Sequence, residues 1–162
     1  MEQTNSMPSQ VPDVSRITDY LFLSSLPRHE HAEHIWDLGI RLIVSLPLYW
    51  PPKVYRRPPF AFVHCPTIDS PLTPIPIFML RRGVRAALPV IEHGGGVLIH
   101  CKAGVHRSVA MATCILIAHA YTADEAMKLV AEQRPVADPY APYIQSRIRK
   151  FEQDWHRRHG SS

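Results

Sequence analysis

A cysteine and an arginine separated by one tight loop form the most reactive combination in this chain. Cys101 directly follows the largely apolar run of residues 97–100, which is typical of a buried strand. The helix expected from about His106 would direct unpaired backbone N–H groups, and the positive end of its dipole, toward Cys101. Such a position favours the thiolate form of a cysteine and also binds phosphate. The arrangement predicts a thiolate nucleophile that attacks a phosphate group.

The loop itself supplies donors for phosphate oxygens. Gly104 permits the tight turn that points successive amides inward, and Arg107 adds a planar, two-pronged donor. A buried structural cysteine beside an incidental arginine is the alternative. We expect phosphate binding by the loop residues Lys102, Ala103, Gly104, Val105, His106 and Arg107.

The flanking residues extend this pattern into a family signature. The order His100, Cys101, Gly104, Arg107 and Ser108, between an apolar strand and an apolar helix, resembles the signature of cysteine-dependent phosphatases. Within these it is most similar to the small (atypical) dual-specificity protein phosphatases. The resemblance covers nearly the whole chain. It implies a catalytic domain over residues 13–157, between a flexible N-terminal segment (1–12) and a flexible C-terminal tail (158–162).

The resemblance also implies a role for each site residue. Cys101 attacks phosphorus, and Ser108 donates a hydrogen bond to the sulfur as it leaves. Asp69 lies on the loop after a predicted strand, where the family keeps the acid that protonates the leaving oxygen and then activates water. The alternatives are a turn-forming or capping Asp69 and an ordinary first-turn Ser108. No metal or cofactor is implied, because amides and a guanidinium would stabilise the developing charge.

Composition fits one intracellular domain. The chain has 162 residues, of which 46% are hydrophobic, which suits a single core. Three cysteines at unrelated spacings (Cys65, Cys101 and Cys114) argue against a disulfide framework and for a reducing, cytoplasmic compartment. The longest apolar run, residues 109–118, is too short to span a membrane. The formal charge of +4 suits an anionic substrate, and nothing demands nucleic acid.

The hydrophobic pattern predicts an α/β fold. Strands are expected near residues 16–17, 20–23, 41–46, 60–64 and 97–100, and helices near 27–38, 73–92, 107–120, 122–133 and 142–155. We expect a central, largely parallel sheet of about five strands with helices on both faces. The loop of Cys101 would lie at the carboxyl end of its strand.

Two further groups of residues invite functional interpretations. His29, His31 and His34 are expected to face water from the first helix, and without a carboxylate or cysteine nearby they do not complete a metal site. The proline-rich loop 47–59 holds three aromatic residues, which form either a substrate wall or a cap on the core.

The nature of the substrate stays open between several classes. A phosphorylated protein is favoured, with phosphotyrosine and phosphoserine or phosphothreonine as targets. A phospholipid headgroup is the alternative, because Lys102 and Ala103 also follow the cysteine in lipid-acting relatives and His106 adds positive charge. A phosphate-binding module without turnover, or a redox or sulfur-transfer protein, is less favoured. Cys65 is interpreted as a core residue, with a disulfide to oxidised Cys101 as the alternative. The sequence leaves the oligomeric state undetermined.

Overall fold

A five-stranded sheet forms the centre of the molecule. The computed structural model describes residues 11–160. The strands lie in the order β1-β2-β5-β3-β4, and β1 is antiparallel to β2 whereas the other pairs are parallel. This confirms the predicted, largely parallel sheet. The strands are β1 (Val14–Arg16), β2 (Leu21–Ser24), β3 (Ile40–Ser45), β4 (Ala61–His64) and β5 (Gly96–His100).

Alternate residues of the central strands face opposite layers, as the pleat of a sheet requires. On β5, Val97 and Ile99 join the larger core cluster, whereas Leu98 joins the smaller one. The continuous apolar character of β3 and β5 follows from burial on both faces. The helices therefore cover both faces of the sheet, as predicted.

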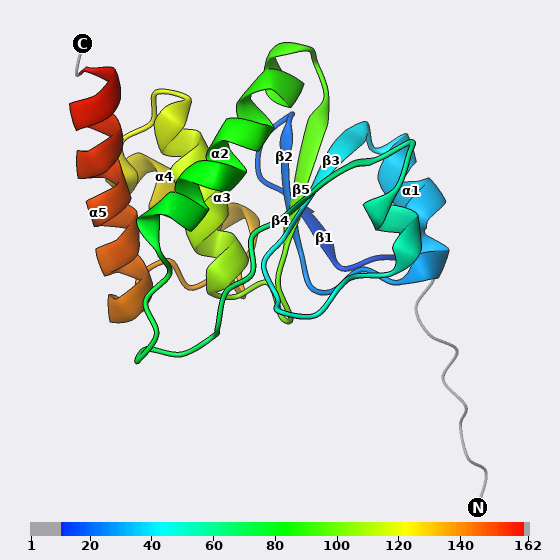
Figure 1. Cartoon of the computed structure of the whole chain (residues 1–162), viewed down its shortest axis with the longest axis horizontal. Helices are drawn as coiled ribbons and strands as arrows, with labels where there is room; N and C mark the ends of the chain where they lie inside the picture. The colour runs from blue at the N-terminus through cyan, green and yellow to red at the C-terminus, as the bar shows by residue number, and fades with distance from the viewer. Residues whose placement is uncertain (1–10, 161–162) are drawn as a thin grey trace, which may run out of the picture.

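The helices divide unequally between the two faces. The short α1 covers one face, whereas α2 to α5 gather on the other (Figure 1). The α-helices are α1 (Ala32–Asp37), α2 (Ile77–Glu92), α3 (Arg107–Ala118), α4 (Ala123–Gln133) and α5 (Pro142–His159), and the 3-10 helices are η1 (His29–His31) and η2 (Lys53–Arg56).

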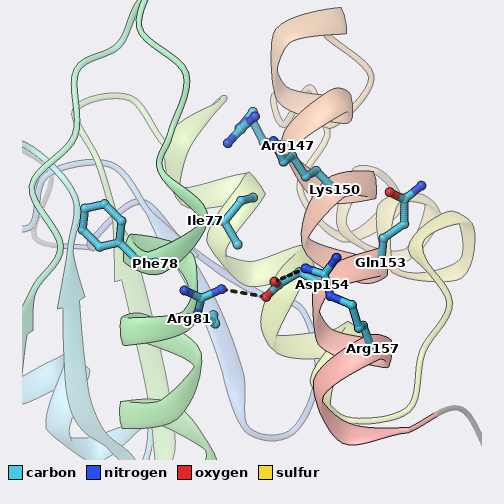
Figure 2. A pocket seen from close by; sticks show the side chains of 8 residues that line it. All are labelled: Ile77, Phe78, Arg81, Arg147, Lys150, Gln153, Asp154 and Arg157. Carbon is cyan, nitrogen blue, oxygen red and sulfur yellow. Dashed lines mark hydrogen bonds and ion pairs between the residues drawn. The ribbon is translucent and has the colours of Figure 1, made fainter.

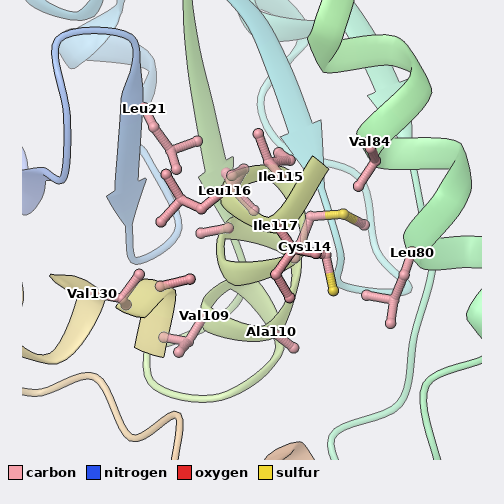
Figure 3. Close-up of a cluster of buried hydrophobic side chains, with 14 of the residues drawn as sticks. Leu21, Leu80, Val84, Val109, Ala110, Cys114, Ile115, Leu116, Ile117 and Val130 are labelled. Atoms are coloured by element: carbon pink, nitrogen blue, oxygen red, sulfur yellow. The ribbon is translucent and has the colours of Figure 1, made fainter. Parts of the chain in front are cut away.

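Helix α3 runs through the middle of the larger core. Eleven of its twelve residues are buried, which confirms the helix that was expected to be apolar on nearly all sides. Figure 3 shows Cys114 and Ile115 of α3 among Leu21 of β2 and Leu80 of α2. Because α3 packs against the sheet and against α2, α4 and α5, its N-terminus is held in a fixed place.

Three sequence-based boundaries need correction. The helix predicted from residue 73 begins at Ile77, because Pro76 disfavours helical geometry in the residue before it. The first helix is short, and His31 is buried rather than facing water. Helix α5 continues to His159, two residues into the segment expected to be a flexible tail. Residues 1–10 of the predicted N-terminal segment lie outside the described residues.

The parallel strands deliver the predicted site residues to one edge of the sheet. Strands β2, β3, β4 and β5 run in the same direction, so the loops that follow them meet there. The loop after β5 contains Cys101 and the loop after β4 contains Asp69. Leu46, which follows β3, links them, because Leu46 N donates to His100 O (3.1 Å) and Thr67 N donates to Leu46 O (2.8 Å).

Candidate active site

Cys101 lies at the end of β5, with its sulfur among polar groups. Its residue surface is 3% exposed. The amide of Gly104 donates to Cys101 Sγ at 3.2 Å, and the hydroxyl of Ser108 lies 3.2 Å from the same atom. These contacts stabilise negative charge on the sulfur if the Ser108 hydroxyl is the donor. Gly104 has φ of +69°, a conformation that glycine adopts without strain.

Arg107 is the first residue of α3, and its guanidinium is held by the neighbouring loop. Its Nη1 donates to the backbone oxygen of Thr67 at 2.9 Å. Thr67 is fixed in turn, since its hydroxyl and amide both donate to Leu46 O at 2.8 Å. Arg107 Nε is buried and has no hydrogen-bond partner among the described residues. The arginine is thus oriented from one side and retains a donor for an anion.

Asp69 is exposed on the loop that follows β4. Its Oδ1 accepts a hydrogen bond from the hydroxyl of Tyr143, on the first turn of α5, at 3.3 Å. Burial, and then the charge of Asp69, raise the pKa of the Tyr143 phenol, so the phenol stays protonated and remains a donor near neutral pH. The Tyr143 ring lies 5.5 Å from the ring of His106, between centroids. Tyr143 therefore connects the Asp69 loop with the Cys101 loop.

A buried arginine, Arg134, holds the Cys101 loop by its backbone carbonyls. Arg134 donates from Nε to Gly104 O at 2.9 Å and from Nη2 to Ala103 O at 3.2 Å. The two Nη atoms also reach the carboxylate of Asp13 at 2.8 and 3.1 Å. These hydrogen bonds hold the pKa of Asp13 below its usual value. A Cβ atom on Gly104 would lie 2.6 Å from Arg134 Nη2, so the loop, its glycine and this arginine fit one another closely.

His100, immediately before Cys101, is buried and uncharged. Burial lowers the pKa of its imidazole to about 4, so the ring carries no charge near neutral pH. Within the described residues neither ring nitrogen has a hydrogen-bond partner. The positive groups at the Cys101 loop are therefore Arg107, the amides and the exposed Lys102, but not this histidine.

The other two cysteines are core residues with free thiols. Cys65 and Cys114 are both fully buried in the larger cluster. Burial raises the pKa of Cys65 to about 11 and raises that of Cys114 well above its usual value. Both thiols are therefore protonated near neutral pH and are poor nucleophiles.

The histidines and aromatic residues that invited other interpretations are now placed. Among residues 11–160, no three or more His, Cys, Asp or Glu side chains form a group that could hold a metal ion. Tyr55 belongs to the smaller core, whereas Trp50 is more than half exposed and contacts His64 in a tilted ring pair with centroids 4.5 Å apart. In the described part of the chain no helix has the length and apolar character to cross a bilayer.

The structure brings the predicted loop residues together and adds contacts that the sequence did not reveal. The residues not predicted as part of the site are Thr67, Tyr143, and the pair Arg134 and Asp13. Thr67 lies two residues before Asp69, but nothing in its spacing indicates the contact with Arg107. Arg134 directly follows the helix predicted over residues 122–133. The only feature that marks Arg134 in the sequence is the proline that follows it, Pro135, and this pair does not by itself predict a buried side chain.

Comparisons with known proteins agree with this geometry. The family model "Dual specificity phosphatase, catalytic domain" matches residues 21–154. The chain is 29% identical over 143 residues to dual specificity phosphatase 28 of Mus musculus, covering 88% of this chain and 85% of that protein. It is also 29% identical over 127 residues to human dual specificity protein phosphatase 14, covering 78% of this chain and 63% of the relative.

Solved structures show the same fold. A crystal structure of human DUSP28 superposes with a TM-score of 0.77 at 27% identity, covering 89% of this chain and 95% of that one. The crystal structure of PTPMT1 gives a TM-score of 0.79 at 22% identity, covering 90% and 97%. The chain belongs to the dual specificity phosphatase family, whose members are cysteine-dependent enzymes that act on phosphorylated substrates. Within it, the chain resembles the small atypical phosphatases.

Proposed function

We propose that the chain removes phosphate from phosphotyrosine and from phosphoserine or phosphothreonine in proteins, through a phosphocysteine intermediate. The observation that carries the proposal is the position of Cys101 Sγ, which contacts the Gly104 amide and the Ser108 hydroxyl before the N-terminus of α3. Family membership supports protein phosphatase activity. The roles of the individual residues are part of the proposal.

In the first step, the Cys101 thiolate attacks phosphorus. The bond from phosphorus to the leaving oxygen breaks, and Asp69 in its acid form transfers a proton to that oxygen. The amides of residues 102–107 and the guanidinium of Arg107 hold the remaining phosphate oxygens. The contact between Arg107 Nη1 and Thr67 O supports this assignment, because it orients the guanidinium toward the loop that also carries Asp69.

In the second step, water hydrolyses the phosphocysteine. The water oxygen attacks phosphorus, and the bond between phosphorus and sulfur breaks. Asp69, now a carboxylate, accepts a proton from this water. The Ser108 hydroxyl donates to the departing sulfur, so the thiolate leaves as a stabilised anion. Asp69 ends protonated, inorganic phosphate is released, and the enzyme returns to its starting state.

Replacing the nucleophile tests the central claim. Cys101→Ser is expected to reduce turnover of an aryl phosphate and of a phosphotyrosine peptide to background, because a serine hydroxyl is not ionised here. Phosphate binding, measured by calorimetry, should remain, since the amides and Arg107 are unchanged. Activity that survives in Cys101→Ser would refute the proposal.

The acid role of Asp69 is tested with leaving groups of different quality. Asp69→Asn is expected to lower kcat by about 100-fold for a phosphoserine peptide, the usual scale of general acid catalysis. For para-nitrophenyl phosphate, whose leaving group needs little protonation, the loss of kcat should be several-fold smaller. An equal loss on both substrates would show that Asp69 acts by another route.

Phospholipid headgroups are a second candidate substrate class. The observation that favours them is a group of exposed apolar side chains on the loops after β2, β3 and β4, namely Leu26, Leu48, Trp50, Ile68 and Leu72. One similar fold, PTPMT1, has been solved in complex with PI(5)P. The values of kcat/KM for a phosphotyrosine peptide and for a soluble short-chain phosphoinositide, compared side by side, decide between the classes.

A further inference from the structure

A second positively charged region lies farther along α5 from the candidate active site, in a cleft between α2 and α5. Figure 2 shows the side chains that line it: Arg81 of α2 and Asp154 of α5 meet across the gap, whereas Phe78 and Gln153 lie on the outer sides of the two helices. Four basic residues and one carboxylate line the cleft, which gives it a formal charge of +3. The lining residues are Ile77, Phe78, Arg81, Arg147, Lys150, Gln153, Asp154 and Arg157.

The single carboxylate is already engaged. Asp154 accepts hydrogen bonds from Arg81 at 2.8 Å and from Arg157 at 3.0 Å, which hold both guanidinium groups at the cleft. Lys150 is exposed and has no hydrogen-bond or ion-pair partner among the described residues. Phe78, which is 62% exposed, adds an apolar surface on the α2 side. The cleft therefore offers cationic groups to an anionic ligand from solution.

One stripe of α5 connects this cleft with the candidate active site. Tyr143, Arg147, Lys150, Asp154 and Arg157 follow one another at intervals of three or four residues, so they share a helix face. At the start of the stripe Tyr143 contacts Asp69, and one turn later Arg147 Nε donates to Ile75 O at 2.9 Å. At 1.5 Å per residue, Lys150 lies about 10 Å and Arg157 about 21 Å along the helix from Tyr143.

We propose that the cleft binds an acidic segment of the phosphorylated protein substrate, an inference that rests on the proposed function. The cationic groups of α5, from Arg147 to Arg157, extend over about 15 Å and match a row of carboxylates along a peptide better than a single headgroup. An extended peptide advances about 3.3 Å per residue, so its acidic residues should lie about three to six positions from the phosphorylated one. The cleft then selects among phosphoproteins without contributing to the chemical step.

The test compares two phosphotyrosine peptides that differ only at those positions, with glutamate in one and glutamine in the other. The unaltered enzyme should give a higher kcat/KM for the acidic peptide, and Lys150→Gln should lower that value about threefold through KM. Lys150→Glu should lower kcat/KM for the acidic peptide further. The kcat/KM for the neutral peptide should be the same in both variants as in the unaltered enzyme. The matched control is Lys53→Gln, because this exposed lysine lies in η2, on the α1 side of the sheet, and its loss removes the same charge.

Binding is measured separately, so that failure of this inference differs from failure of the proposed function. Fluorescence anisotropy with an unphosphorylated acidic peptide should show weaker binding to Lys150→Gln than to Lys53→Gln. If that difference appears but neither phosphopeptide is hydrolysed, the proposed function fails and the acidic-segment site stands. If both peptides are hydrolysed equally well and the binding difference is missing, the inference is overturned. It is also overturned if Lys150→Gln weakens binding only to phosphatidylserine vesicles.

Discussion

Two clusters of arginine and aspartate stabilise this domain, and they differ in which partner is buried. In the Arg134 cluster the guanidinium side chain is 2% exposed, whereas its partner Asp13 is 59% exposed. In the Asp154 cluster the carboxylate side chain is 9% exposed and its partners range from 18% exposed at Arg81 to 77% at Arg157. The buried partner in each cluster has no solvent to replace a lost hydrogen bond.

The difference indicates what each cluster does. The guanidinium of Arg134 donates hydrogen bonds to the carbonyls of Ala103 and Gly104, so it fixes the backbone of the Cys101 loop. Asp154 instead holds the side chains of α2 and α5 together and leaves part of each arginine exposed. The first cluster should therefore affect both stability and catalysis, whereas the second should affect stability and the surface charge of the cleft.

The largest effect is expected from Arg134→Lys. An ammonium group cannot reach both carbonyls and both carboxylate oxygens of Asp13 in the way that a planar guanidinium does. We expect a loss of about 3 kcal/mol in the free energy of unfolding, from breaking a buried charged network. The kcat/KM for an aryl phosphate should fall about tenfold, equivalent to about 1.4 kcal/mol, because the loop amides lose their alignment. Urea unfolding and steady-state kinetics measure the two quantities.

The control for this variant is Asp13→Asn, which keeps a hydrogen-bond acceptor beside Arg134. Because Asp13 is largely exposed, the cost should stay below about 1 kcal/mol, as for other exposed ion pairs. A loss in Asp13→Asn as large as that in Arg134→Lys would mean that the salt bridge, and not the support of the loop carbonyls, accounts for the effect.

A smaller and more selective effect is expected from Asp154→Asn. The substitution removes the charge that Arg81, Arg157 and Arg158 share, and it should cost roughly 2 kcal/mol in the free energy of unfolding. The kcat/KM for a small aryl phosphate should not change, because no contact of Asp154 reaches the Cys101 loop. A fall in kcat/KM similar to that of Arg134→Lys would erase the distinction between the two clusters.

The sequence predicted the fold because its periodic patterns are determined locally. The apolar run of β5 and the apolar helix α3 each follow from a few neighbouring residues, and both are confirmed. The predicted start of α2 was wrong because Pro76 keeps the residue before it out of helical geometry, so Pro76 is the N-cap residue and the helix begins at Ile77. The prediction that His31 faces water was wrong, because burial of a short helical segment depends on tertiary packing, which periodicity does not determine.

The predicted site was incomplete for a similar reason. The Cys101 loop lies within one stretch of chain, so its residue types and spacing are visible in the sequence. The contact from Tyr143 to Asp69 joins residues 74 positions apart, and that from Arg134 to Asp13 joins residues 121 apart. Such pairs depend on the sheet order and on how α5 lies across the loops, and neither can be derived from composition or local pattern.

Acid titration distinguishes the two clusters by the smallest of the expected effects. Burial alone would raise the pKa of Asp154, but the hydrogen bonds from its three arginines outweigh it and hold the pKa at about 2, below the ordinary 3.8. A carboxyl with a depressed pKa contributes stability that is complete above the ordinary value and is lost as the pH falls through the folded-state value. The difference in unfolding free energy between the unaltered chain and Asp154→Asn should therefore be constant near neutral pH and shrink steadily from about pH 4 to pH 2. The corresponding difference for Asp13→Asn should shrink in the same direction but by less, because Asp13 is mostly exposed. Urea unfolding at several pH values checks both, and a difference for Asp154→Asn that is independent of pH would show that its shape, and not its charge, joins α2 to α5.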